Sequence, residues 1–133
     1  MSYVEPIELS PIGIIHCSLE SREQAPRNFD ISTETGTLEI FPEYIEAMDG
    51  IKVGQTIVVL CWLHQARRDI LKVYPRGDKS RGLHGVFATR SPVRPNPIAL
   101  SELMVTKIEQ GNIEVLGLDV LNGTPILDIK KKL

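Results

Sequence analysis

Short runs of apolar, often β-branched residues recur along the chain and predict a protein built mainly of strands. Glycine, proline and asparagine separate most of the runs, as in turns between antiparallel strands. The runs are Ile7–Cys17, Gly36–Phe41, Gln55–Leu63, Ile70–Tyr74, Gly85–Thr89, Ile98–Ile108, Asn112–Leu118 and Ile126–Ile129. Many short strands of this kind favour an all-β domain whose mainly antiparallel sheet closes into a barrel or folds into a sandwich.

Two segments add detail to this pattern. Pro42–Met48 predicts one short helix of about two turns, because proline is favoured in the first turn of a helix. Thr106–Ile113 alternates on either side of Glu109–Asn112 and predicts a hairpin. The remaining connections are expected to be long loops.

The run Gly85–Leu100 combines three prolines with two arginines, Arg90 and Arg94. Each proline fixes its own φ and biases the preceding residue toward extended geometry, so Ser91–Pro97 should form a stiff, non-helical loop between short strands. Such a loop would hold guanidinium groups in place. A surface turn whose prolines only lower the entropy of the unfolded chain explains the same residues.

Length and composition indicate one soluble globular domain. The chain has 133 residues, of which 42% are hydrophobic and 24% charged. No apolar stretch approaches the roughly 20 residues that cross a bilayer, and the acidic N-terminus is unlike a signal peptide, so we expect a cytoplasmic protein without a membrane segment. Cys17 and Cys61 are expected to be reduced core thiols.

The formal charge of −2 is unevenly distributed. Between Arg67 and Arg94 there are eight basic and two acidic residues, a net charge of +6, which leaves −8 for the remainder. This split favours an electropositive face that meets an anionic partner, although a solvated basic surface is the ordinary alternative. Few aromatic residues are available for base stacking, which argues against a general single-strand binder.

Several familiar chemistries are excluded by the motifs. No glycine-rich loop follows a strand and opens a helix, so neither a P-loop nor a dinucleotide fingerprint is present. The three histidines, His16, His64 and His84, have no companion cysteine or histidine at ligand spacing, so no metal site is expected.

Polar side chains gather where several predicted strands end. These segments are Ala25–Asn28, Trp62–Gln65, Arg90 after Val86–Thr89, Asp119–Asn122 and Leu127–Lys130. Each has a structural alternative, such as an Asn-Gly turn at Asn122 or a surface ion pair between Asp128 and Lys130.

Taken together, these segments resemble the TsaA-like (TrmO) family of S-adenosylmethionine-dependent tRNA methyltransferases. The resemblance is carried by Ile12–His16, Pro26-Arg27, His64-Gln65, Gly85–Ile98 and Asn122–Lys130, in this order along almost the whole chain. It implies a closed β-barrel working as a homodimer, not the doubly wound fold of most methyltransferases. It also implies methylation of N6 of threonylcarbamoyl-adenosine at position 37 of tRNA.

Transferred residue by residue, the resemblance implies a cofactor pocket for S-adenosylmethionine. Its residues would be Pro26, Arg27, Asn28, His64, Gln65, Arg90, Leu100, Asp119, Val120, Leu121 and Asn122. Asn28 stands where the family often has glutamine, and Asn122 where it often has aspartate. Bacterial members continue into a further domain beyond Leu133, whereas a single domain spanning residues 1–133, with no additional C-terminal domain, is expected here.

The chemistry of methyl transfer assigns roles within this set. Arg27 or Arg90 suits the carboxylate of the cofactor, Asp119 its ammonium group, and backbone near Leu100 or Val120–Asn122 its adenine. Asp128 and His64 are the catalytic candidates for the base that accepts the N6 proton, with Asp119 as a third. Phosphate contacts to the tRNA are predicted for Arg76, Lys79, Arg81 and Arg94.

Two alternatives stay open. The chain could be an S-adenosylmethionine-binding or tRNA-binding module without catalysis. It could also be a methyltransferase that acts on another substrate.

Overall fold

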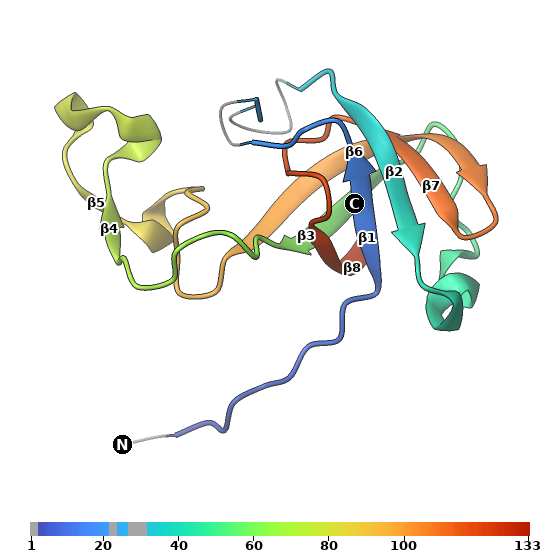
Figure 1. Ribbon diagram of the computed structural model, residues 1–133, viewed down its shortest axis with the longest axis horizontal. Coiled ribbons are helices and arrows are strands. Elements are labelled where there is room, and N and C mark those ends of the chain that lie inside the picture. The colour runs from blue at the N-terminus through green and yellow to red at the C-terminus, as the bar shows by residue number, and fades with distance from the viewer. Residues whose placement is uncertain (1–2, 22–23, 27–31) are drawn as a thin grey trace.

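Six antiparallel strands close into a barrel in the computed structural model, which describes residues 3–21, 24–26 and 32–133 (Figure 1). The order around the barrel is β1-β2-β7-β6-β3-β8. The strands are β1 (Gly13–Cys17), β2 (Thr35–Ile40), β3 (Thr56–Trp62), β6 (Ile98–Glu109), β7 (Asn112–Leu116) and β8 (Pro125–Lys131). The predicted all-β, closed antiparallel barrel is confirmed.

The core fills the barrel interior, because alternate residues of each strand point inward. In β3 the buried positions are Ile57, Val59 and Cys61, and in β6 they include Leu103 and Val105. Fully burying an aliphatic side chain of this size stabilises the fold by about 1.5–3 kcal/mol. The alternation seen in the sequence therefore corresponds to the inward and outward faces of the barrel wall.

The predicted hairpin and the predicted helix are both present. Strands β6 and β7 pair antiparallel from Met104↔Leu116 to Glu109↔Asn112, and Gly111 takes a positive φ of 80° in the tight turn between them. The helix η2 (Pro42–Met48) has 3₁₀ geometry. Its half-buried apolar side chains Tyr44, Ile45 and Met48 pack against the core, so η2 is held by these contacts rather than by helix length.

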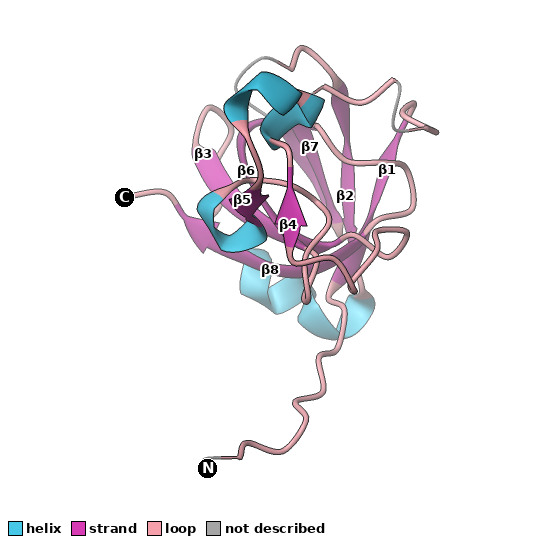
Figure 2. Ribbon diagram, turned by 90° about the vertical axis from the view of Figure 1, so that its left-hand side faces the viewer, coloured by secondary structure: helices cyan, strands magenta, loops and turns pink. Residues whose placement is uncertain are grey.

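Between β3 and β6 the chain leaves the barrel and forms a lobe, residues 63–97. The lobe contains a two-stranded sheet of β4 (Lys72–Val73) and β5 (His84–Gly85). It also contains three short 3₁₀ helices, η3 (Pro75–Gly77), η4 (Lys79–Arg81) and η5 (Val86–Ala88). Figure 1 shows β4 and β5 to one side of the barrel, and Figure 2 views the molecule from that side.

The prediction of a strand over Gly85–Thr89 is wrong beyond Gly85. Val86–Ala88 form the 3₁₀ helix η5, and the amide and hydroxyl groups of Thr89 both donate hydrogen bonds to the Val86 carbonyl oxygen. These local bonds close a turn on Val86, whose own amide donates to the Leu71 carbonyl oxygen beside β4. Arg90 therefore follows a turn that is pinned by the buried side chain of Val86, not the end of a strand.

In the described part of the chain, no helix combines the length and the hydropathy needed to span a bilayer.

Candidate functional site

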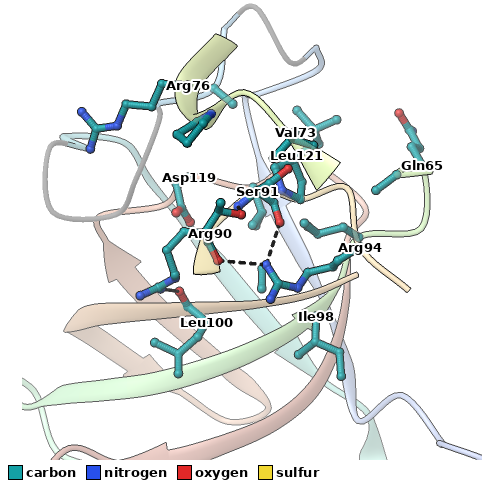
Figure 3. Close-up of a pocket in the computed structure, with 18 of the residues that line it drawn as sticks. Gln65, Val73, Arg76, Arg90, Ser91, Arg94, Ile98, Leu100, Asp119 and Leu121 are labelled. Carbon is teal, nitrogen blue, oxygen red and sulfur yellow. Dashed lines mark hydrogen bonds between the residues drawn. The ribbon is translucent and has the colours of Figure 1, made fainter. Parts of the chain in front are cut away.

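A cavity of about 1070 Å³ lies between the lobe and one end of the barrel (Figure 3). The barrel contributes Ile98–Leu100 from the start of β6 and Asp119–Leu121 from the segment after β7. The lobe contributes His64, Gln65, Arg90 and Arg94, among others. The cavity is large enough for a cofactor-sized molecule, and its wall combines apolar side chains with a few charged groups.

The proline-containing loop is tied to the base of the lobe by Arg68. The Arg68 guanidinium stacks on the Trp62 ring, 5.0 Å from its centroid. Its Nε donates to the Pro95 carbonyl oxygen at 2.7 Å, and its Nη2 donates to Asn96 Oδ1 at 3.1 Å. Residues 91–97 contain no helix or strand, as predicted, and these contacts hold that irregular backbone against the cavity.

Arg94 crosslinks the same loop from within. Its Nη1 donates to the carbonyl oxygens of Thr89 at 3.2 Å and Ser91 at 3.0 Å, the two bonds dashed in Figure 3. The side chain is half-buried and lines the cavity. Two of the donors of Arg94 are thus used by the protein's own backbone, so this arginine has a structural role besides any role in binding.

Two opposite charges at the cavity are held by consecutive residues of β6. Arg90 Nη2 donates to the Leu100 carbonyl oxygen at 3.0 Å, and Ser101 Oγ donates to Asp119 Oδ1 at 2.7 Å. Both Arg90 and Asp119 line the cavity. Because the strand fixes the spacing of residues 100 and 101, it also restrains a guanidinium and a carboxylate at the same end of the barrel.

Most of the predicted cofactor residues are brought together at this cavity. The lining residues include Pro26, His64, Gln65, Arg90, Leu100, Asp119, Val120 and Leu121. Arg27 and Asn28 lie outside the described residues. Asn122 does not line the cavity; its Oδ1 accepts from the Cys17 amide at 3.1 Å, and its Nδ2 donates to Glu20 Oε1 at 3.2 Å.

The predicted base Asp128 lies elsewhere on the barrel. It belongs to β8, opposite Leu60 of β3, and is not among the residues that line the cavity. Its Oδ2 is 3.3 Å from Lys130 Nζ, and its Oδ1 accepts from the Ile129 amide. The alternative of a surface ion pair describes this geometry, whereas His64 does reach the cavity wall.

The basic residues predicted to contact RNA divide into two groups. Arg76, Arg81 and Arg94 line the cavity, and Lys79 does not. Asp78 caps η4 by accepting from the Ser80 hydroxyl and amide, and these hydrogen bonds lower the pKa of the Asp78 carboxyl. One oxygen of the Asp78 carboxylate also lies 3.5 Å from Arg81 Nε, so the positive charge of Arg81 is partly balanced.

Sequence reasoning missed Ser101 and Arg68. Ser101 is the one polar residue at an inward position among the apolar residues of Ile98–Val105, and that exception to the alternation is a signal that the sequence does carry. Arg68 belongs to an Arg67-Arg68 pair in which sequence alone does not distinguish the two side chains.

Both cysteines are free thiols, as predicted, but they differ in burial. Cys61 is buried in the barrel interior. Its burial is the larger cause, and the negative charge of Asp119 the smaller one, of a thiol pKa that is raised to about 12. Cys17 is half-buried, and its pKa is raised mainly by burial. The described residues contain no cluster of three or more His, Cys, Asp or Glu side chains that could hold a metal ion.

Residues 14–132 match the family model described as the tRNA-methyltransferase O (TrmO) N-terminal domain. The chain belongs to this family. It is 43% identical over 125 residues to a probable S-adenosyl-L-methionine-binding protein of Methanothermobacter thermautotrophicus, covering 93% of this chain and 88% of that protein. It is 39% identical to an S-adenosyl-L-methionine-binding protein of Archaeoglobus fulgidus, covering 92% and 87% respectively.

Solved structures with the same fold come from the TrmO family as well. The crystal structure of TrmO from Pseudomonas aeruginosa superposes with a TM-score of 0.78 at 32% identity. The match covers 97% of this chain but 57% of the P. aeruginosa chain, so this chain corresponds to little more than half of that protein. The resemblance seen in the sequence is confirmed at the level of family and fold.

Proposed function

We propose that this protein transfers the methyl group of S-adenosylmethionine to N6 of threonylcarbamoyl-adenosine at position 37 of tRNA. The observation that carries the proposal is the cavity, where Arg90 and Asp119 are held by consecutive residues of β6. Membership in a family described as a tRNA methyltransferase domain, and relatives named as S-adenosylmethionine-binding proteins, support the same conclusion.

The donor set fits the cofactor. The amino-acid end of S-adenosylmethionine carries a carboxylate and an ammonium group, which match a guanidinium fork and a carboxylate respectively. We assign the first contact to Arg90 and the second to Asp119, and the adenine to the wall formed by Leu100, Val120 and Leu121, where backbone groups and apolar side chains lie together. When bound, the cofactor supplies a methyl group on a positively charged sulfur.

The protein's part in the reaction is mainly positioning. Attack on a methyl carbon that is bonded to a positively charged sulfur needs no covalent enzyme intermediate, so the residues of the cavity would align the two reactants and exclude competing water. The N6 atom loses a proton as it is methylated, and His64, which lines the cavity, is the side chain that we assign to receive it. The role of Asp128 as a base stays a prediction, because Asp128 does not line the cavity that a single chain forms.

The lobe supplies the RNA-binding face in this proposal. Arg76 and Arg81 lie at the cavity, and Lys79 extends the positive charge along η4. Phe87, at 82% exposure, is the most exposed apolar side chain of the lobe and offers a face on which an unpaired base can stack. Phosphate contacts by the basic side chains would position an anticodon loop beside the cavity.

A homodimer completes the proposal. It is implied by the family resemblance, and Leu71 and Leu83 of the lobe are more than half exposed, which is consistent with a surface that a partner covers. Sedimentation equilibrium at several protein concentrations tests it; a mass that stays at the monomer value of 14.9 kDa contradicts the dimer.

The reaction itself is tested with methyl-labelled S-adenosylmethionine and two tRNA samples, one carrying threonylcarbamoyl-adenosine and one lacking it. We expect label in the modified tRNA only, and at least a tenfold loss of rate with Asp119→Asn, because the ammonium group loses its charged partner. Label in neither sample, with cofactor binding intact, would instead support a binding module without catalysis. Label in both samples would contradict the proposed substrate.

A further inference from the structure

We infer that Ser101 is a positioning residue for cofactor binding and that it acts through the carboxylate of Asp119. The inference rests on the proposed function, because it takes Asp119 as the partner of the cofactor's ammonium group. Ser101 itself is not among the residues that line the cavity. Its hydroxyl touches Asp119 Oδ1 at 2.7 Å from the barrel interior.

The Ser101 hydroxyl is buried in an apolar core. Among the described residues, Ser101 and Thr124 are the buried polar side chains, and Ser101 is 2% exposed. It occupies an inward position of β6, in the same series as Leu103 and Val105, and pairs in register with Val59 of β3. A buried hydroxyl is unfavourable unless it forms a hydrogen bond, and the bond of this hydroxyl is the one to Asp119.

Asp119 lies on backbone that is outside the sheet. Strand β7 ends at Leu116, so Asp119 lies beyond the last residue that the sheet holds in register. The two preceding amides, of Gly117 and Leu118, both donate to the Glu34 carbonyl oxygen, which anchors the segment but does not set the direction of the Asp119 side chain. The bond from Ser101 connects that carboxylate to a regular strand, and so restrains its direction.

Leu100 and Ser101 each hold one charged side chain at the cavity. Successive residues of a strand point to opposite faces, and here one residue holds Arg90 through its carbonyl oxygen while the next holds Asp119 through its side chain. A zwitterionic amino-acid group needs a cation and an anion at a fixed separation. Because β6 sets that separation, loosening either contact should weaken binding of this group and leave the rest of the ligand unaffected.

The test compares two ligands that share the adenosine and the sulfur. S-adenosylhomocysteine carries the zwitterionic amino-acid group, and 5′-methylthioadenosine lacks it. Calorimetric titration of Ser101→Ala should give about tenfold weaker binding of S-adenosylhomocysteine, because the Asp119 carboxylate loses the hydrogen bond that orients it toward the ammonium group. Binding of 5′-methylthioadenosine should change little. Asp119→Asn should show the same selectivity with a larger loss.

Val59→Ala is the matched control, because Val59 is fully buried opposite Ser101 but has no polar group. Thermal unfolding of this variant should show at least as large a destabilisation as Ser101→Ala, while its affinities for both ligands stay at the wild-type values. Equal losses for the two ligands in Ser101→Ala, or no loss for either, would overturn the role of Ser101. Absence of binding by the wild-type protein would overturn the proposed function, and the role of Ser101 with it.

Discussion

Arg68 is predicted to stabilise the wall of the cavity more than its neighbour Arg67 does. Replacing it with alanine removes two hydrogen bonds, to the Pro95 carbonyl oxygen and Asn96 Oδ1, and the stacking on Trp62. Each hydrogen bond is worth about 1 kcal/mol and an exposed cation–π contact about 0.5–1 kcal/mol. Because the side chain is exposed and water competes, we expect a net loss of about 1–2 kcal/mol in the free energy of unfolding.

Arg67→Ala is the matched control for this prediction. Arg67 is the preceding residue, and its guanidinium forms an exposed ion pair with Asp69 at 2.8 Å. This pair raises the pKa of Arg67 and lowers the pKa of Asp69, but both groups are fully solvated and the pair is screened by water and salt. Urea unfolding should therefore give a wild-type midpoint for Arg67→Ala and a lower midpoint for Arg68→Ala.

The same two variants distinguish an effect on the order of the loop from an effect on the stability of the whole protein. Asn96 lines the cavity, so loosening it should weaken binding of S-adenosylhomocysteine a few-fold in Arg68→Ala under conditions where the protein is fully folded. Identical midpoints and identical affinities for Arg67→Ala and Arg68→Ala would refute the reasoning. That result would mean that the prolines and the Arg94 hydrogen bonds hold the loop without Arg68.

Three further predictions follow from the barrel and the lobe. At pH 8, iodoacetamide should modify Cys17 in the native protein but Cys61 only after unfolding, because the buried Cys61 thiol has a pKa raised to about 12 and stays protonated; mass spectrometry showing both labelled in the native state contradicts this. Lys79→Ala should lower the slope of log affinity for tRNA against log salt by about 1 and leave cofactor affinity unchanged, as measured by filter binding and calorimetry; a parallel loss of cofactor binding contradicts the separation. Gly13→Ala should destabilise the barrel in thermal unfolding, since a Cβ there would overlap the Glu39 carbonyl oxygen, and an unchanged melting temperature would show that β1 and β2 can separate.

The barrel was predictable because its strands follow the simplest rule of sheet structure. Residues 55–63 and 98–108 alternate or run apolar over lengths typical of strands. The structure places β3 within the first range, and β6 covers the second and ends one residue later; the two strands pair from Thr56↔Met104 to Trp62↔Ile98. The hairpin of β6 and β7 was equally predictable, from the turn that contains Gly111. Closure of the barrel does not follow from alternation, which is equally typical of a sandwich; it was the family resemblance that favoured a barrel.

The lobe was harder to predict, because its structure depends on local hydrogen bonds and on contacts distant in sequence. Val86–Ala88 have the composition of a strand, yet the Thr89 hydroxyl and amide close a 3₁₀ turn on Val86. The prolines did indicate an irregular loop. They gave no indication that Arg68, more than 20 residues earlier, would be its anchor.

The candidate site was predictable as a set of residues and not as a geometry. Strand ends drew attention to His64, Arg90 and Asp119, and all three line one cavity. The contacts that orient Arg90 and Asp119, from Leu100 and Ser101, join segments 10 and 18 residues apart in sequence and depend on which face of β6 each residue occupies. Asp128 shows the opposite case: the sequence predicted it at a strand end, whereas it lies in the middle of β8 with its side chain paired with Lys130.

The most direct test of the proposed function is the content of modified nucleosides in cellular tRNA. Total tRNA from cells with and without the gene would be digested to nucleosides and analysed by mass spectrometry, with the Asp119→Asn variant supplied in place of the deleted gene as a third sample. We predict that N6-methylated threonylcarbamoyl-adenosine disappears on deletion, returns with the wild-type gene and does not return with the variant. An unchanged amount of this nucleoside after deletion would contradict the account.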